Sequence, residues 1–156
     1  MRRLLPALLL LAACISEPPP SPPIVWYSVA PLPTPPRVGT IDRERIVEAY
    51  YASDLFHEYS AALSRERERA ERAGDDRQAA ILRMQENTIH KLRERQLDGE
   101  SGVANIIMAL EGLMPAIATS RGIDIIVETG TWSEASKNVI DVTDDVVAKL
   151  PPPPGT

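Results

Sequence analysis

Residues 64–76 read SRERERAERAGDD, a run of alternating Arg and Glu that ends in a turn signal. Opposite charges four positions apart, such as Arg67 and Glu71, favour a helix with a solvated surface. Gly74, followed by Asp75 and Asp76, interrupts this pattern and favours a turn. The stretch therefore predicts the polar tip of a helical hairpin, with Gly74 at the point where the chain reverses.

Heptad seams extend from this tip in both directions. Small or apolar residues, with one charged member, precede it in steps of four and three: Ala52, Phe56, Tyr59, Leu63, Glu66, Ala70 and Ala73. The same spacing follows it without a slip across Asp98-Gly99: Leu82, Gln85, Ile89, Leu92, Gln96, Gly99, Val103, Ile106, Leu110, Leu113 and Ile117. We expect one helix over 43–73, about 46 Å long, and one long helix with a soft middle up to about residue 120.

The far end of the second helix has a different character. Residues 106–110 are apolar nearly all round, which predicts burial against more than one neighbour. Pro115 predicts a kink in the last turns, because proline lacks the amide hydrogen that a helix requires. The hairpin should therefore have a solvated tip and a packed base.

Short β-like runs flank the hairpin. Residues 38–41 precede Asp42, a good N-cap, and two runs rich in β-branched residues follow over 123–128 and 139–142. Thr143 is expected to cap a short final helix over 144–150. The predicted fold is α+β and mostly α, with a long antiparallel coiled-coil arm on a small β body. Such a small sheet and one-sided seam favour self-association.

Composition limits the function. The chain has 156 residues, room for one ordinary domain, and its formal charge of −5 argues against nucleic-acid binding. Nine of its 15 prolines lie between Pro18 and Pro36, and four form the run at 151–154. These strips predict a semi-rigid spacer and a disordered tail on either side of the folded part.

The first residues predict export and lipid attachment. Arg2 and Arg3 precede a short apolar run and then Leu11-Ala12-Ala13-Cys14, which resembles a bacterial lipobox. Cleavage before Cys14 would allow acylation of the only cysteine, which has no partner for an internal disulfide. Ordinary export with an unmodified Cys14 is the alternative. Cleavage would leave 15 basic and 22 acidic residues, a formal charge of −7.

We therefore expect a signal peptide over 1–13, a lipidated Cys14 with a Pro-rich spacer to residue 36, a folded domain over 37–150, and a tail over 151–156. Within the domain, the arms should occupy about 43–120 and the β body 38–42 and 122–150. The apolar patch Ile24-Val25-Trp26-Tyr27 interrupts the spacer. Either an added edge strand or a foot at the membrane interface would explain it.

Two segments resemble the OmpH/Skp family of periplasmic chaperones. They are VGTIDRERIV at 38–47, and ATSRGIDIIV at 118–127 together with VIDVTDDVV at 139–147. The order of strand, helical hairpin, strand, strand and helix matches over about 38–150. The resemblance implies a homotrimer that holds unfolded outer-membrane proteins in the periplasm without ATP. Family members are typically soluble and basic, whereas this chain is acidic, has short arms and carries a lipobox-like segment. Ile15, rather than an Asp that would retain a lipoprotein in the inner membrane, follows Cys14, which favours anchoring to the outer membrane.

A passive holdase needs apolar contacts rather than a catalytic group. Candidate client-binding residues on the arms are Tyr59, Leu63, Ile81, Leu82, Met84 and Ile89; packing within the hairpin seam is the alternative for each, and Met84 lies off the seam. Candidates for the body of the oligomer are Ile41, Ile106, Ile107, Leu110, Leu113, Ile117, Ile125, Val127, Trp132 and Ile140.

A structural or adaptor lipoprotein is the alternative function, with the coiled coil acting as a spacer or assembly platform. We do not expect an enzyme, a cofactor or a metal site. His57 and His90 stand apart from any nucleophile. Asp141, Asp144 and Asp145 are better explained as helix-capping residues than as cation ligands.

Overall fold

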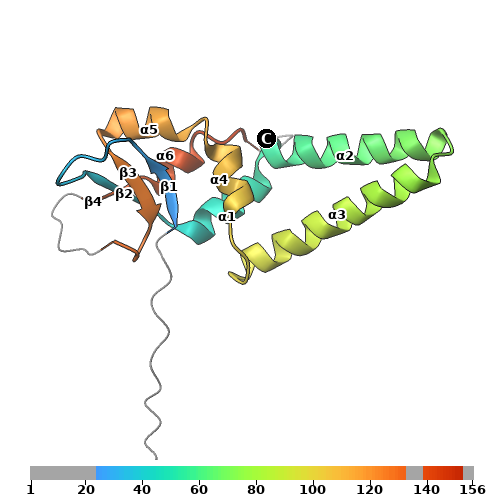
Figure 1. Ribbon diagram of the computed structural model, residues 1–156, viewed down its shortest axis with the longest axis horizontal. Helices are drawn as coiled ribbons and strands as arrows, with labels where there is room; N and C mark the ends of the chain where they lie inside the picture. Colours follow the sequence, from blue (N-terminus) through green and yellow to red (C-terminus); the bar gives the residue numbers. More distant parts are fainter. Residues whose placement is uncertain (1–23, 133–138, 153–156) are drawn as a thin grey trace, which may run out of the picture.

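A computed structural model describes residues 24–132 and 139–152. It confirms an α+β fold made mostly of helix, in which a body carries a projecting pair of helices (Figure 1). The elements follow the order β1 (Val25–Ser28), β2 (Val38–Ile41), α1 (Arg43–Ala52), α2 (Asp54–Arg72), α3 (Asp76–Leu97), α4 (Ala104–Leu110), α5 (Met114–Arg121), β3 (Ile125–Glu128), β4 (Val139–Asp141) and α6 (Thr143–Val147).

The four strands form one sheet in the order β1-β3-β2-β4. Strand β2 pairs in parallel with both β3 and β4, and β1 adds an antiparallel edge to β3. The patch at 24–27 is thus largely an edge strand, and its Trp26 is buried in the core. The folded body consequently begins within the segment that we expected to be spacer.

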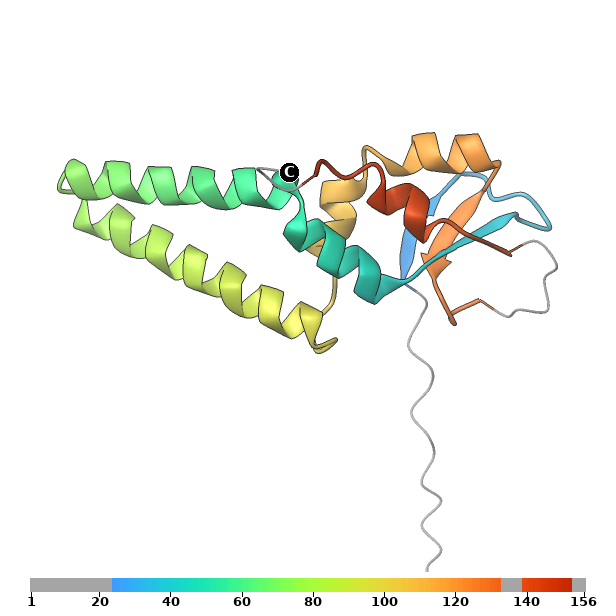
Figure 2. The ribbon, with the colours of Figure 1, turned by 180° about the vertical axis from the view of Figure 1, so that it is seen from behind.

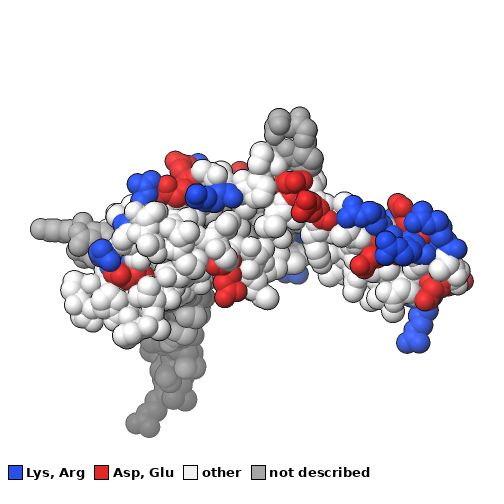
Figure 3. Space-filling model, turned by 90° about the horizontal axis from the view of Figure 1, so that it is seen from above, with Lys and Arg blue, Asp and Glu red and all other residues white. Residues whose placement is uncertain are grey.

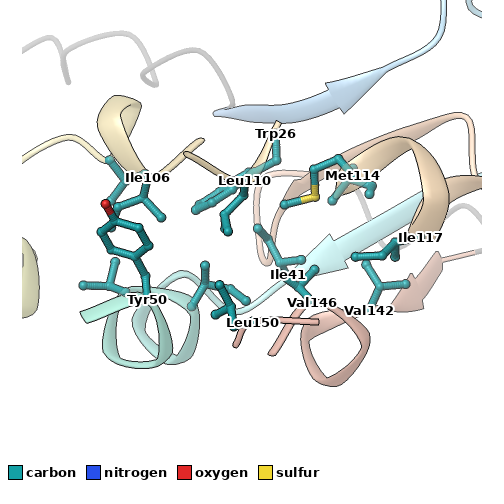
Figure 4. Packing of buried hydrophobic residues seen from close by; sticks show 14 of the residues in the cluster. Trp26, Ile41, Tyr50, Ile106, Leu110, Met114, Ile117, Val142, Val146 and Leu150 are labelled. Atoms are coloured by element: carbon teal, nitrogen blue, oxygen red, sulfur yellow. The ribbon is translucent and has the colours of Figure 1, made fainter. Parts of the chain in front are cut away.

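The main core lies between the sheet and helices α1, α4, α5 and α6. Figure 4 shows Ile41 from β2 and Trp26 from β1 meeting Leu110 and Met114. Side chains alternate along β3, so Ile126 joins this core while Ile125 and Val127 form a smaller cluster with Val38. Trp132 packs against that second cluster. Both faces of the short sheet therefore bury apolar surface.

Most residues proposed for an oligomeric body pack within a single chain. Those buried in its own clusters are Ile41, Ile106, Leu110, Ile117, Ile125 and Val127. Ile107, Leu113 and Trp132 are partly buried, and Ile140 on edge strand β4 is exposed. Only these last four retain surface for another chain.

The expected helix over 43–73 is divided. Ser53 adopts an extended backbone, with ψ of 156°, and separates α1 from α2. Its hydroxyl donates a hydrogen bond of 2.6 Å to the Tyr50 carbonyl oxygen, which satisfies the end of α1. The heptad pattern did not reveal this break, because serine is compatible with a surface helix as well as with a cap.

The expectation of one long helix from 76 to about 120 was wrong. Helix α3 ends at Leu97, Gly99 takes a positive φ of 76°, and α4 begins only at Ala104. Glycine makes this left-handed turn without the steric cost that another residue would meet. Pro115 also does not kink a helix; it lies in the first turn of α5, where a missing amide hydrogen costs nothing.

Other local predictions have mixed outcomes. The Asp42 carboxylate accepts a hydrogen bond from the Arg45 amide at 3.2 Å, confirming the N-cap, and Gly74 has the positive φ of a turn residue. Thr143 is not the expected cap of α6. It is buried, and its hydroxyl accepts from the Asp42 amide at 2.9 Å and donates to the Asp141 carboxylate at 2.6 Å. Thr143 thus joins α6 to the start of α1.

Candidate binding groove between helices α2 and α3

Helices α2 and α3, with the turn at 73–75, are here called the helix pair. The two helices meet at the Gly74 turn and diverge toward the body (Figures 1 and 2). Ion pairs hold them together near the tip: Arg67 contacts Glu71 and Glu86, each at 2.9 Å, and Arg83 contacts Glu71 at 2.8 Å. These guanidinium groups hold the Glu71 pKa below its usual value, with Arg83 as the largest cause.

Aromatic side chains fill the wide end of the helix pair. The rings of Tyr51 and Phe56 meet edge to face, with centroids 4.7 Å apart, and Tyr50 lies 5.2 Å from Tyr51 and 5.8 Å from Phe56. All three are buried. The break at Ser53 lets residues from α1 and α2 converge here, where a continuous helix would point Tyr50 and Phe56 in different directions.

A buried amide connects this aromatic cluster to the loop after α3. The Tyr51 hydroxyl donates to Gln96 Oε1, and Gln96 Nε2 donates to Asn105 Oδ1 at 2.7 Å and to the Gly102 carbonyl. Arg93 lies over the Tyr51 ring, 5.6 Å from its centroid. Burial raises the pKa of both Tyr50 and Tyr51.

Two adjoining hollows open above this floor. One, of about 310 Å³, is lined by Tyr50, Tyr51, Phe56, Tyr59, Ile89, Leu92 and Asn105. The other, of about 290 Å³, is lined by Tyr59, Met84, Gln85, Thr88 and Ile89. Tyr59 and Ile89 border both hollows, which we treat as one groove. Its lining is apolar apart from a few uncharged amide and hydroxyl groups, as expected for a site that accepts an apolar chain.

The predicted client-binding residues divide between this groove and the rest of the helix pair. Tyr59, Met84 and Ile89 line the groove; Tyr59 is 55% exposed and Met84 63%. Leu82 is instead buried toward the tip, consistent with the alternative of seam packing. Leu63 is half-buried and Ile81 exposed, and neither borders the groove.

The prediction missed Tyr50 and Tyr51 as groove residues. A compositional signal was present, since four of the chain's five Tyr and Phe residues fall within 50–59. In a chain so poor in aromatic residues, that concentration indicates a local aromatic surface. Periodicity obscured it, because only Phe56 and Tyr59 lie on the heptad seam.

The three aspartates considered as cation ligands have other partners. Asp144 pairs with Arg45 at 2.5 Å, Asp145 pairs with Arg121 at 2.6 Å, and Asp141 accepts from Thr143. Residues 24–132 and 139–152 contain no cluster of three potential metal ligands. His57 and His90 are exposed.

The predicted signal peptide and Cys14 lie outside the described residues. Within the described part, no helix is both long and apolar enough to cross a membrane. Comparison with known proteins gave no match to this chain among protein-family models, curated proteins or solved structures.

Proposed function

We propose that the chain is a membrane-anchored, ATP-independent holdase that binds unfolded outer-membrane proteins in the periplasm. The observation that carries the proposal is the groove on the helix pair. Tyr59 and Met84 expose large apolar side chains toward the same hollow, on helices that are otherwise strongly charged. Exposed apolar side chains that gather in one hollow favour a binding role over a purely structural one.

The chemistry of the groove suits clients that vary in sequence. Methionine is flexible and polarisable, and tyrosine offers a flat apolar face with a polar edge, so both adapt to different side chains. Strands of outer-membrane barrels alternate apolar and polar residues. An unfolded client could therefore place apolar side chains in the groove and leave the polar ones in water. Such binding needs no nucleotide.

The same proposal includes the oligomeric state and the membrane anchor. We propose a homotrimer in which the helix pairs are coiled-coil arms around a client space, anchored to the outer membrane through a lipidated Cys14. Several weak grooves acting together would hold a client much more tightly than one. The resemblance of residues 38–47, 118–127 and 139–147 to the OmpH/Skp family supports this arrangement.

The test is suppression of aggregation of a denatured outer-membrane barrel by the full chain in mild detergent. The groove variant Tyr59→Ser/Met84→Ser should lose most of the suppression. The matched control is Met108→Ser, which alters a side chain even more exposed than Met84 but on α4 of the body. If the groove variant suppressed aggregation as well as Met108→Ser does, the groove would not be the client-binding site.

No suppression by the wild type at tenfold excess would reject the holdase and favour the structural or adaptor lipoprotein. Light scattering of the same protein preparations gives the mass of the oligomer, which tests the trimer separately. Palmitate incorporation that disappears in Cys14→Ser tests the anchor.

A further inference from the structure

The outer face of α2 carries a charge pattern that is symmetric about its own centre. Asp54 and Glu58 lie toward the body, Ala61 and Ala62 follow, and Arg65 and Arg69 lie toward the tip. The spacings between these six positions read the same from either end. At about 100° per residue they share one face of the helix, roughly opposite Phe56 and Leu63 on the seam. We call this face the outer stripe.

The outer stripe is exposed and its charges are available. Glu58, Arg65 and Arg69 are exposed and Asp54 is partly exposed. In the part of the chain that the structure describes, the side chains of these four residues form no ion pair. Figure 3, which looks down on this side of the molecule, shows acidic groups near the start of the helix pair and basic groups gathered toward its tip.

The surface between the two charged ends is hollowed. A shallow depression of about 730 Å³ is bordered by Asp54, Leu55, His57, Glu58, Tyr59, Ala61, Ala62 and Arg65. Because Ala61 and Ala62 are small, another helix can approach closely at this point. A long apolar partner is disfavoured, since both ends of the depression carry charge.

We propose that the outer stripe binds the outer stripe of a second copy of this chain, antiparallel about a two-fold axis. That arrangement places Glu58 against Arg65 and Asp54 against Arg69 of the other copy, and the reverse, with Ala61 facing Ala62 at the centre. An interface of this kind is isologous, so each ion pair occurs twice. It joins two helix pairs back to back and leaves the floor of the groove uncovered, although Tyr59 borders both the depression and the groove.

The contact area is limited to one face of a helix of about five turns. Association is therefore weak, depends on concentration and weakens at high salt. Copies held on one membrane meet at a higher effective concentration than copies in solution. The inference does not depend on the holdase function, because the outer stripe and the floor of the groove are on different sides of α2.

Charge reversal tests the proposal. In the full chain in mild detergent, Glu58→Arg alone or Arg65→Glu alone places like charges together twice and should weaken association roughly tenfold. The double variant Glu58→Arg/Arg65→Glu restores both pairs and should recover wild-type association. Sedimentation at several concentrations gives the readout, and circular dichroism checks that the helices are retained.

A steric variant provides an independent measurement. Ala61→Arg should abolish the association, whereas Ala80→Arg, at an exposed position on α3, should leave it unchanged. Each disruptive variant should lower the mass toward that of the oligomer that the body forms without this contact. An unchanged mass in Ala61→Arg, or a double reversal that fails to restore association, would overturn the proposal. Aggregation suppression measured on the same variants reports separately on the holdase.

Discussion

The body and the helix pair bury their apolar residues in different ways. In the body, two strands and three helices contribute Trp26, Ile41, Leu110, Met114 and Val146 to one core. In the helix pair, only two elements meet, and near the tip Ala79 and Leu82 are the buried apolar residues. Burial among many elements specifies a fixed structure, whereas a two-helix contact leaves surface available for binding. This difference places most of the stability in the body and leaves the helix pair with the exposed surface for which we propose a binding role.

The largest expected effect compares two leucines of similar burial, Leu110 in the body and Leu82 in the helix pair. Leu110→Ala should lower the free energy of unfolding by about 3–5 kcal/mol, because it leaves a cavity in a closed core. Leu82→Ala should cost less, about 1–2 kcal/mol, since the site borders an open hollow and can relax. Urea denaturation followed by circular dichroism gives both values. Equal losses would mean that the two regions form one cooperative core.

The next largest expected effect on stability concerns a glycine in the sheet of the body. A Cβ on Gly39 of β2 would lie 2.9 Å from Ile123 Cδ1 and 3.3 Å from Ile126 Cγ1. Gly39→Ala should therefore cost about 1–3 kcal/mol through overpacking. Gly112→Ala is the matched control, because nothing lies within 4 Å of the added methyl group. If Gly39→Ala were neutral, the packing of Ile123 and Ile126 against β2 would be looser than these distances indicate.

The smallest expected effect concerns ion pairs and pH. The Arg37 guanidinium and amide hold the Asp124 pKa below its usual value of about 4. A carboxylate whose pKa is lower in the folded state stabilises the fold at neutral pH, and this contribution is lost as the pH falls below about 4. Asp124→Asn should make global unfolding less sensitive to pH in that range.

Glu71→Gln is the control in the helix pair, where Arg83 and Arg67 lower the carboxyl pKa in the same way. It should leave the global midpoint nearly unchanged and speed hydrogen exchange only near the tip, because that region opens locally. Urea midpoints between pH 2.5 and 7 measure how strongly global unfolding depends on pH in each variant. A global shift in Glu71→Gln would contradict the separation of the two regions.

Local signals in the sequence predicted much of this fold. Asp42 and Gly74 mark helix ends through side-chain capping and positive φ, which are properties of single residues. The β-branched runs around Ile125 and Val139 became strands because their side chains suit a pleated surface. Alternating charges near Arg67 predicted a solvated helical tip for the same local reason.

Tertiary structure decided the rest. Periodicity continued through Ser53 and Gly99, but the breaks at these residues let α1 and α4 place apolar side chains such as Ile46 and Ile106 in the main core. Long-range pairing also gave residues 25–28 the role of an edge strand, which the sequence left open against a membrane foot. The groove exists only because the break at Ser53 brings Tyr50 and Tyr51 beside Phe56. Sequence alone determined where helices and strands can form, whereas the choice of which residues to bury together depended on contacts between distant segments.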